Sequence, residues 1–363
     1  MYFFTRDEDD DFDIDIEKVN SGTYSPLKLH RVSFFLDAGL EGGSPMGFGF
    51  DGSMLIPRTP SVSTPDAAMD CFNCVKAAMM LGGLALDAST HGMMGFGELK
   101  SSGYFRYTRA LGSEAQISQA LQEGGAGGQL NISLLSPRRI TEKEVGDAYA
   151  KGQKVFSHLT KLNAAYLSLA YSSLRRSETR NALVFGWVAC EQVIQQIWDE
   201  FLIGDQDVYG TEKRRKGLKA TRNVAPMLEL LALAKIISED AYETLSVARK
   251  ARNDFAHKGG TVTFDSAFEC VSGLILLVQE FADLKGVSTG TSHLLEIFNA
   301  SEEKDAKHSA KEATKAENVD WEGVKYWREM YKIPGDEDWE GGDILLDGVE
   351  LMDATEEANA KDD

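Results

Sequence analysis

Residues 252–257 carry the side chains of this sequence that are best suited to chemistry at a phosphate group. They read Arg-Asn-Asp-Phe-Ala-His, and Lys258, Gly259 and Gly260 follow directly. The guanidinium of Arg252 presents a planar set of donors that fits two phosphate oxygens, and the imidazole of His257 can exchange a proton near neutral pH. An Arg and a His at this separation also arise by chance in a chain of this composition, so the surrounding elements decide what the pattern means.

The motif closes a predicted helix over residues 238–257. Ser238 is a typical N-cap before two first-turn acids, and Gly259 is a typical helix stop. Side chains at helical spacing define the packing face of this helix: Tyr242, Leu245, Ala248, Arg252 and Phe255. We therefore expect Arg252 to lie within the packing face and to need a polar partner there.

Arg252 and His257 do not meet on a straight helix. Five residues at 100° each place His257 about 140° around the helix from Arg252. Two arrangements could bring them together. Either the chain unwinds before His257, or a second copy of the helix completes the site across a two-fold axis, which predicts a homodimer.

Helical periodicity extends over residues 139–290 and predicts an all-α bundle. The other helices are expected at residues 141–174, opened by a Thr141–Glu144 capping box, and at residues 181–202, 226–237 and 264–284. Short links favour an antiparallel bundle. A basic loop that contains Lys213, Arg214 and Arg215 precedes the third helix.

The regions on either side of the bundle differ from it in composition. Residues 1–138 are glycine-rich, with a helix expected at 65–81 after Thr64 as its N-cap, and strands expected at 31–36, 53–56, 104–108 and 132–135. This pattern predicts a small mixed or β-rich domain of sensory or regulatory role. Residues 291–363 form an acidic extension that we expect to be partly disordered, with 20 acidic against 8 basic residues over 301–363. The fold class predicted for the chain is therefore α+β.

Charge and cysteine content exclude several classes of protein. A net charge of −19 argues against non-specific coating of nucleic acid, so any RNA contact must be local. Neither a membrane-length apolar run nor a signal sequence is present, which favours a cytoplasmic protein. Cys71 and Cys74 lack a second pair to close a zinc site. The Gly-x-Gly-x-x-Gly pattern at residues 47–52 precedes a strand-like run rather than a helix, which argues against a dinucleotide site.

The bundle resembles the HEPN superfamily (higher eukaryote and prokaryote nucleotide-binding domains) over about residues 141–290. The resemblance rests on helix order and on two groups of residues: Trp187, Glu191 and Trp198 in the long second helix, and Arg252, Asn253 and His257 in the fourth. Many members are metal-independent endoribonucleases that act as toxins or anti-phage effectors, and pair two protomers around one cleft. The resemblance implies that Arg252 and His257 are catalytic, with Asn253 in the variable polar position.

That chemistry is attack of an RNA 2′-hydroxyl on the adjacent phosphate, with His257 moving protons and Arg252 holding developing charge. No metal or cofactor is expected. The cations expected to contact RNA are Arg249, Lys250 and Lys258 beside the motif, and Lys213, Arg214 and Arg215 in the basic loop. Expected partners are a second copy of the chain, RNA, and an antitoxin or other protein bound by the acidic tail.

Other interpretations of the same residues remain open. Arg252 and His257 could be cations favoured at a helix C-terminus, and the chain could be an inactive HEPN-like dimerisation or nucleotide-binding adaptor. Asp254 could orient His257 or pair with Lys258, and we favour the pair. Glu191 could be a hydrogen-bonded core acid or could support the site, and we favour the former.

Overall fold

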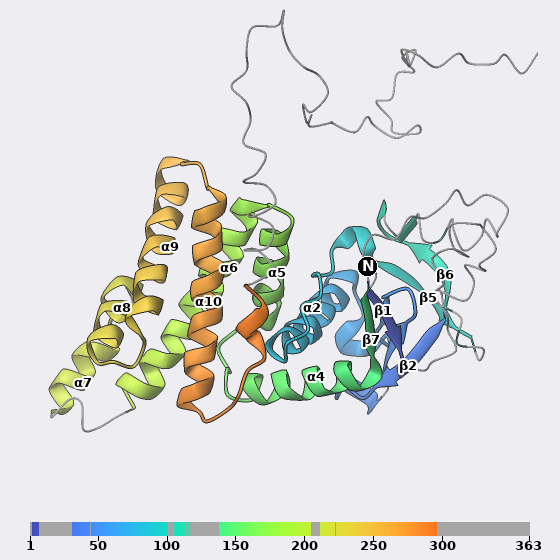
Figure 1. Cartoon of the computed structure of the whole chain (residues 1–363), viewed down its shortest axis with the longest axis horizontal. Helices are drawn as coiled ribbons and strands as arrows, with labels where there is room; N and C mark the ends of the chain where they lie inside the picture. The colour runs from blue at the N-terminus through green and yellow to red at the C-terminus, as the bar shows by residue number, and fades with distance from the viewer. Residues whose placement is uncertain are drawn as a thin grey trace, which may run out of the picture. The chain divides into compact units, whose positions relative to one another are not determined.

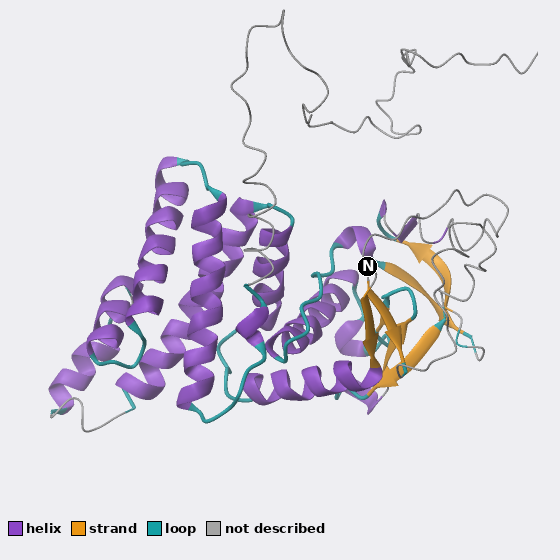
Figure 2. Ribbon diagram, viewed as in Figure 1, coloured by secondary structure: helices purple, strands orange, loops and turns teal. Residues whose placement is uncertain are grey.

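The computed structural model describes residues 2–6, 31–43, 45–100, 103, 105–113, 115–116, 119, 138–204, 211–221 and 223–295. The predicted strand at 132–135 and the acidic tail from residue 296 lie outside these ranges. The described residues form eight α-helices and three small β-sheets (Figures 1 and 2), so the expectation of a mixed chain with a helical bundle is confirmed at this level.

Three small sheets build the N-terminal region. Strand β1 (Tyr2–Thr5) pairs in parallel with β7 (Arg138–Thr141), which joins the two ends of this region. Strands β2 (Val32–Leu36), β3 (Met46–Gly49) and β4 (Met54–Leu55) form an antiparallel sheet, and β5 (Gly95–Leu99) pairs with β6 (Phe105–Ala110) as a hairpin. Strands were predicted at β2, β4 and β6, whereas β1, β3, β5 and β7 were missed. The Gly-x-Gly-x-x-Gly pattern spans β3 and the turn into β4, so no helix follows it.

The core of this region is built around three phenyl rings, those of Phe4, Phe34 and Phe48. The rings of Phe34 and Phe48 stack at 4.9 Å, and Phe4 meets Phe48 edge-on at 5.0 Å. All three side chains are buried. Aromatic packing of this kind adds to the burial of apolar area and holds short strands together that would not be stable alone.

Helix α2 (Pro65–Leu81) begins at the predicted N-cap, Thr64, whose hydroxyl accepts from the backbone of Ala67. It crosses α4 (Glu142–Phe156) at very short range. A Cβ atom added at Gly152 would lie 1.8 Å from the carbonyl oxygen of Ala78, and one added at Gly82 would lie 1.9 Å from that of Ala148. The absence of side chains at these two glycines therefore sets the distance between the helices.

The single helix predicted over residues 141–174 is wrong, because the chain breaks between α4 and α5 (Ala164–Arg175). Two glutamines of the next helix hold the break. Gln196 accepts from the backbone N–H of Lys161, and Gln192 accepts from that of Asn163, which then caps α5. The backbone N–H groups at this break are hydrogen-bonded by side chains that are distant in sequence. Helical periodicity in the sequence does not reveal such long-range contacts. The capping box of Thr141 and Glu144 at the start of α4 is confirmed.

Helices α6 (Thr179–Ile197), α8 (Val224–Leu233), α9 (Glu239–Lys258) and α10 (Phe264–Leu284) complete the bundle, and α10 has the predicted bounds. A π-helical turn, Trp198–Leu202, extends α6. The expectation of an antiparallel bundle is wrong for α6 and α10. Thr179 donates to the carbonyl of Val262 at one end, and Lys285 pairs with Glu200 at the other, so these helices run parallel. Helices α7 (Glu212–Lys219) and α8 lie between α6 and α9 in sequence. Helix α9 runs in the opposite direction to α6, and α10 runs beside α6 in the same direction (Figure 1).

The bundle core includes residues from outside the bundle. Ala77, Met80 and Leu81 of α2 belong to the same buried cluster as Trp187 and Val193 of α6. After α10 the chain returns to this cluster, where the hydroxyl of Tyr171 donates to the carbonyl of Leu294 and the N–H of Gly290 donates to Leu81. Leu294 is fully buried, so the described chain remains packed on the core through this residue.

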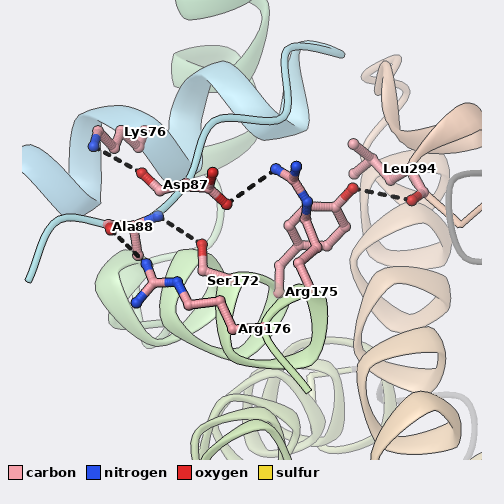
Figure 3. A network of polar contacts seen from close by, with 8 residues as sticks. Lys76, Asp87, Ala88, Ser172, Arg175, Arg176 and Leu294 are labelled. Atoms are coloured by element: carbon pink, nitrogen blue, oxygen red, sulfur yellow. Dashed lines mark hydrogen bonds and ion pairs between the residues drawn. The ribbon is translucent and has the colours of Figure 1, made fainter. Parts of the chain in front are cut away.

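A polar network joins the segment after α2 to the C-terminal end of α5 (Figure 3). Arg175 donates to the carboxylate of Asp87 at 3.0 Å, and Arg176 donates to the carbonyl of Ala88 at 3.0 Å. The N–H of Ala88 donates to the hydroxyl of Ser172 at 2.6 Å, and the amine of Lys76 donates to the carbonyl of Asp87 at 2.7 Å. These contacts tie the N-terminal region to the bundle through hydrogen bonds as well as shared apolar core.

Candidate active site at the end of α9

Helix α9 is regular to its last residue, Lys258. Gly259 adopts a left-handed conformation, with φ of 64°, and its N–H donates to the carbonyl of Phe255 at 3.1 Å. The N–H of Gly260 donates to the carbonyl of Asp254 at 3.2 Å. Because these bonds close the helix after the histidine, the arrangement in which the chain unwinds before His257 is wrong.

Arg252 is half-buried one turn after the buried Ala248. Its Nη1 donates to the side-chain oxygen of Asn253 at 3.2 Å. The expectation that Arg252 sits at the packing face with a polar partner is therefore confirmed. A guanidinium held in this way keeps its remaining donors free for a second acceptor.

His257 is exposed at the helix end. Among the described residues, its imidazole forms no hydrogen bond and no ion pair. It is also about 140° around the regular helix from Arg252, so one chain does not bring the two groups together. The imidazole is therefore available to solvent or to a second molecule.

The interpretation that Asp254 pairs with Lys258 is confirmed. The amine of Lys258 donates to the Asp254 carboxylate at 2.7 Å, one helical turn away. This hydrogen bond and the charge of Lys258 lower the pKa of Asp254 below its usual value. The predicted phosphate contact Lys258 is thus partly neutralised, and Asp254 does not orient His257.

The first turns of two other helices lie beside the end of α9. The hydroxyl of Thr179, at the start of α6, donates to the carbonyl of Val262 in the loop that leads to α10. Helix N-termini carry partial positive charge, and α6 adds the exposed Arg180. Arg180 was missed as a candidate because the start of α6 lies beside the loop between α9 and α10 only through the parallel arrangement of α6 and α10.

The other predicted RNA contacts divide into two groups. Arg249 is half-buried and Lys250 is exposed, both on α9 about two turns before the motif ends. Lys213, Arg214 and Arg215 lie on a helix, α7 (Glu212–Lys219), so their expected place in a loop is wrong; Thr211 caps this helix. Figure 1 shows α7 and the α9–α10 connection at opposite ends of the bundle. Within one chain the α7 cations therefore do not flank His257.

Other candidate sites of the sequence are accounted for by packing. Glu191 accepts from the indole N–H of Trp187 at 2.6 Å, as expected of a hydrogen-bonded acid. Cys71 and Cys74 lie within α2, where burial raises the pKa of both thiols. No cluster of three or more metal-ligating side chains occurs among the described residues. None of the described helices is long and apolar enough to cross a membrane.

A surface hollow lies at the other end of α9. It is lined by residues from the end of α8, the start of α9 and the end of α10, including Leu233, Ile236, Glu280 and Leu284. The motif at the C-terminal end of α9 does not contribute to it. Arg252 and His257 therefore lie on an open helix end and not in this hollow.

Comparison of the chain with protein-family models, with curated proteins and with solved structures found no match. Any functional assignment therefore stands on the residues and their geometry.

Proposed function

We propose that the chain is a metal-independent endoribonuclease of the HEPN type, acting as a homodimer in a defence or stress system. The proposal rests on the contacts, exposure and separation of the two motif residues. Arg252 donates to Asn253, the exposed imidazole of His257 has no hydrogen-bond partner among the described residues, and a regular helix keeps the two groups apart. A second copy of α9 supplies what one copy lacks.

A two-fold arrangement of this helix end places one chain's imidazole opposite the other chain's guanidinium. An RNA phosphate between them meets a fixed cation and a proton-transfer group. The imidazole takes the proton of the 2′-hydroxyl as that oxygen attacks phosphorus. The bond from phosphorus to the 5′-oxygen then breaks, and the imidazolium returns the proton to the leaving 5′-oxygen. The products are a 2′,3′-cyclic phosphate and a free 5′-hydroxyl. The reaction requires the 2′-hydroxyl, which selects RNA over DNA.

Local charge supports an anionic substrate in an otherwise acidic chain. Arg249 and Lys250 add cations on the last three turns of α9, and Arg180 adds one at the start of α6, beside the loop between α9 and α10. The first turns of α6 and α10 add partial positive charge. The α7 cations lie at the far end of the same chain, so they contact substrate only if RNA spans the bundle or if the partner chain presents them.

The test is incubation of the full chain with labelled RNA in EDTA. The expected products end in 2′,3′-cyclic phosphate. The variant His257→Ala should lower the rate by a factor on the order of 10² to 10⁴, the usual contribution of positioned proton transfer. The matched control is His158→Ala, which removes another exposed histidine and should leave the rate unchanged. Sedimentation should give the same oligomeric state for all three proteins.

The same experiment also tests the alternative function, an inactive dimerisation or nucleotide-binding adaptor. One observation favours this alternative: the motif residues lie outside the surface hollow at the other end of α9. A dimer that leaves RNA intact under all conditions would support the adaptor. Cleavage that needs magnesium, or that persists in His257→Ala, would contradict the ribonuclease mechanism.

A further inference from the structure

The β5–β6 hairpin presents an exposed aromatic ring flanked by arginines. In the strand register Phe96 lies opposite Arg109, and Glu98 lies opposite Arg106. The guanidinium of Arg58, which follows β4, sits over the Phe96 ring with its carbon 5.3 Å from the ring centroid. Phe96 is nonetheless 43% exposed. An open ring face and three guanidiniums therefore share one small surface.

The acid between these three arginines, Glu98, interacts mainly with another cation, Lys100, and more weakly with Arg106. Glu98 pairs with Lys100 at 2.5 Å, and this contact lowers the pKa of the Glu98 carboxyl. Across the described residues, Arg58, Arg106 and Arg109 take part in no ion pair. The surface thus carries excess positive charge within a chain of net charge −19. Such a local concentration of positive charge favours a partner with several negative charges close together.

We propose that this surface binds single-stranded nucleic acid. A base stacks on the exposed face of Phe96, and the neighbouring phosphates contact the three arginines. Arg106 and Arg109 are three residues apart along β6, about 10 Å at the usual strand rise, so they reach different phosphates. An acidic protein segment would use the arginines but has no need of a stacking ring beside them. The flat ring therefore favours a nucleic-acid strand.

This inference does not depend on cleavage at α9. Single-stranded DNA has the same bases and phosphates but lacks the 2′-hydroxyl that the proposed cleavage requires. DNA binding can therefore be measured without turnover. If the ribonuclease proposal fails and DNA still binds through Phe96, the hairpin site stands alone. If both hold, the hairpin is a second contact for the substrate strand.

The experiment uses the full-length chain and fluorescence anisotropy with labelled 12-nucleotide DNA and RNA in EDTA. Three phosphate contacts predict that log K falls with log salt at a slope of about −2 for a single strand. Phe96→Leu should weaken binding of both strands by a factor of roughly 5 to 150, the usual contribution of one stacked base. Arg109→Ser should reduce the slope by about 0.7.

Two variants serve as matched controls. Phe35→Leu changes another exposed phenylalanine, 48% exposed on β2, and Lys143→Ser changes an exposed cation on α4. Both should bind as the unmodified chain does. Circular dichroism and thermal melting should show that every variant remains folded, because all the substituted side chains are at the surface.

Several results would overturn the proposal. Binding that is unchanged in Phe96→Leu would remove the stacking step. Equal competition by polyglutamate, which carries charge without bases, would identify a general anion surface. Binding lost only in Lys213→Ser would place the contact on α7. Equal affinity for DNA and RNA, or tighter binding of RNA, would each support the site, the second adding a contact to the 2′-hydroxyl.

Discussion

Lys76 should make the stability of this protein increase with pH in the alkaline range. Its amine lies at the polar junction between α2 and α5, where it donates to the carbonyl of Asp87 (Figure 3). It also donates to the hydroxyl of Ser89. Burial lowers the pKa of Lys76 from 10.5 to about 8, against the opposing effect of Asp87 and with a further decrease from Arg176. The folded state therefore gives up this proton before the unfolded state does.

The sign and size of this pH dependence follow from proton linkage. Below about pH 8 the amine is charged in both states, and the folded state carries the full penalty of burying that charge. Between about pH 8 and 10.5 the unfolded chain holds one more proton, so the free energy of unfolding rises with pH. The slope approaches 1.4 kcal/mol per pH unit, and the whole gain is about 3 kcal/mol.

The assay is urea denaturation of the unmodified chain and of Lys76→Met from pH 7.5 to 10.5. Subtracting the two free energies of unfolding at each pH removes the contributions of other titrating groups. The difference should grow in favour of the unmodified chain as pH rises. A constant offset, however large, would show that Lys76 does not titrate in this range in the folded state, because lost hydrogen bonds alone would shift stability equally at every pH.

Two further predictions concern packing and the helix end. Gly152→Ala places a Cβ against the Ala78 carbonyl, and should destabilise the fold by about 3 kcal/mol in urea denaturation. Gly217→Ala, in an open position inside α7, should instead add up to about 1 kcal/mol, and equal effects of the two would contradict the crossing geometry. The pKa of Asp254, followed by NMR, should lie below its usual value and rise in Lys258→Gln. A carboxyl group whose pKa is lowered in the folded state adds stability that is lost as the pH falls through this lowered pKa, so the small contribution of Asp254 should vanish on acidification. An unchanged titration of Asp254 in Lys258→Gln would exclude the ion pair between Asp254 and Lys258.

Local signals in the sequence predicted local structure well. The capping residues Thr64, Thr141 and Ser238 each begin a helix where expected. The glycine at 259 ends α9 in the left-handed conformation that favours this residue. These features depend on a few neighbouring residues, and their chemistry is visible without the fold.

Features that depend on distant residues were not predicted. The break before α5 is held by Gln192 and Gln196 from the next helix, and β1 pairs with a strand more than 130 residues away. The parallel run of α6 and α10 likewise places the start of α6, which carries Arg180, beside the loop between α9 and α10. The candidate pair Arg252 and His257 was found from residue type and spacing. Only the structure shows that α9 is unbroken, so that one chain does not bring the two side chains together.

In the proposed homodimer, two copies of α9 build one cleavage site from Arg252 and His257. The most direct measurement is the rate of RNA cleavage per chain in EDTA as the protein is diluted, with sedimentation at the same concentrations. We predict that the rate per chain falls in step with the dimer fraction and that the products carry 2′,3′-cyclic phosphate. Cleavage that stays constant per chain when the protein is monomeric, or no cleavage by a stable dimer, would contradict a composite site of Arg252 and His257.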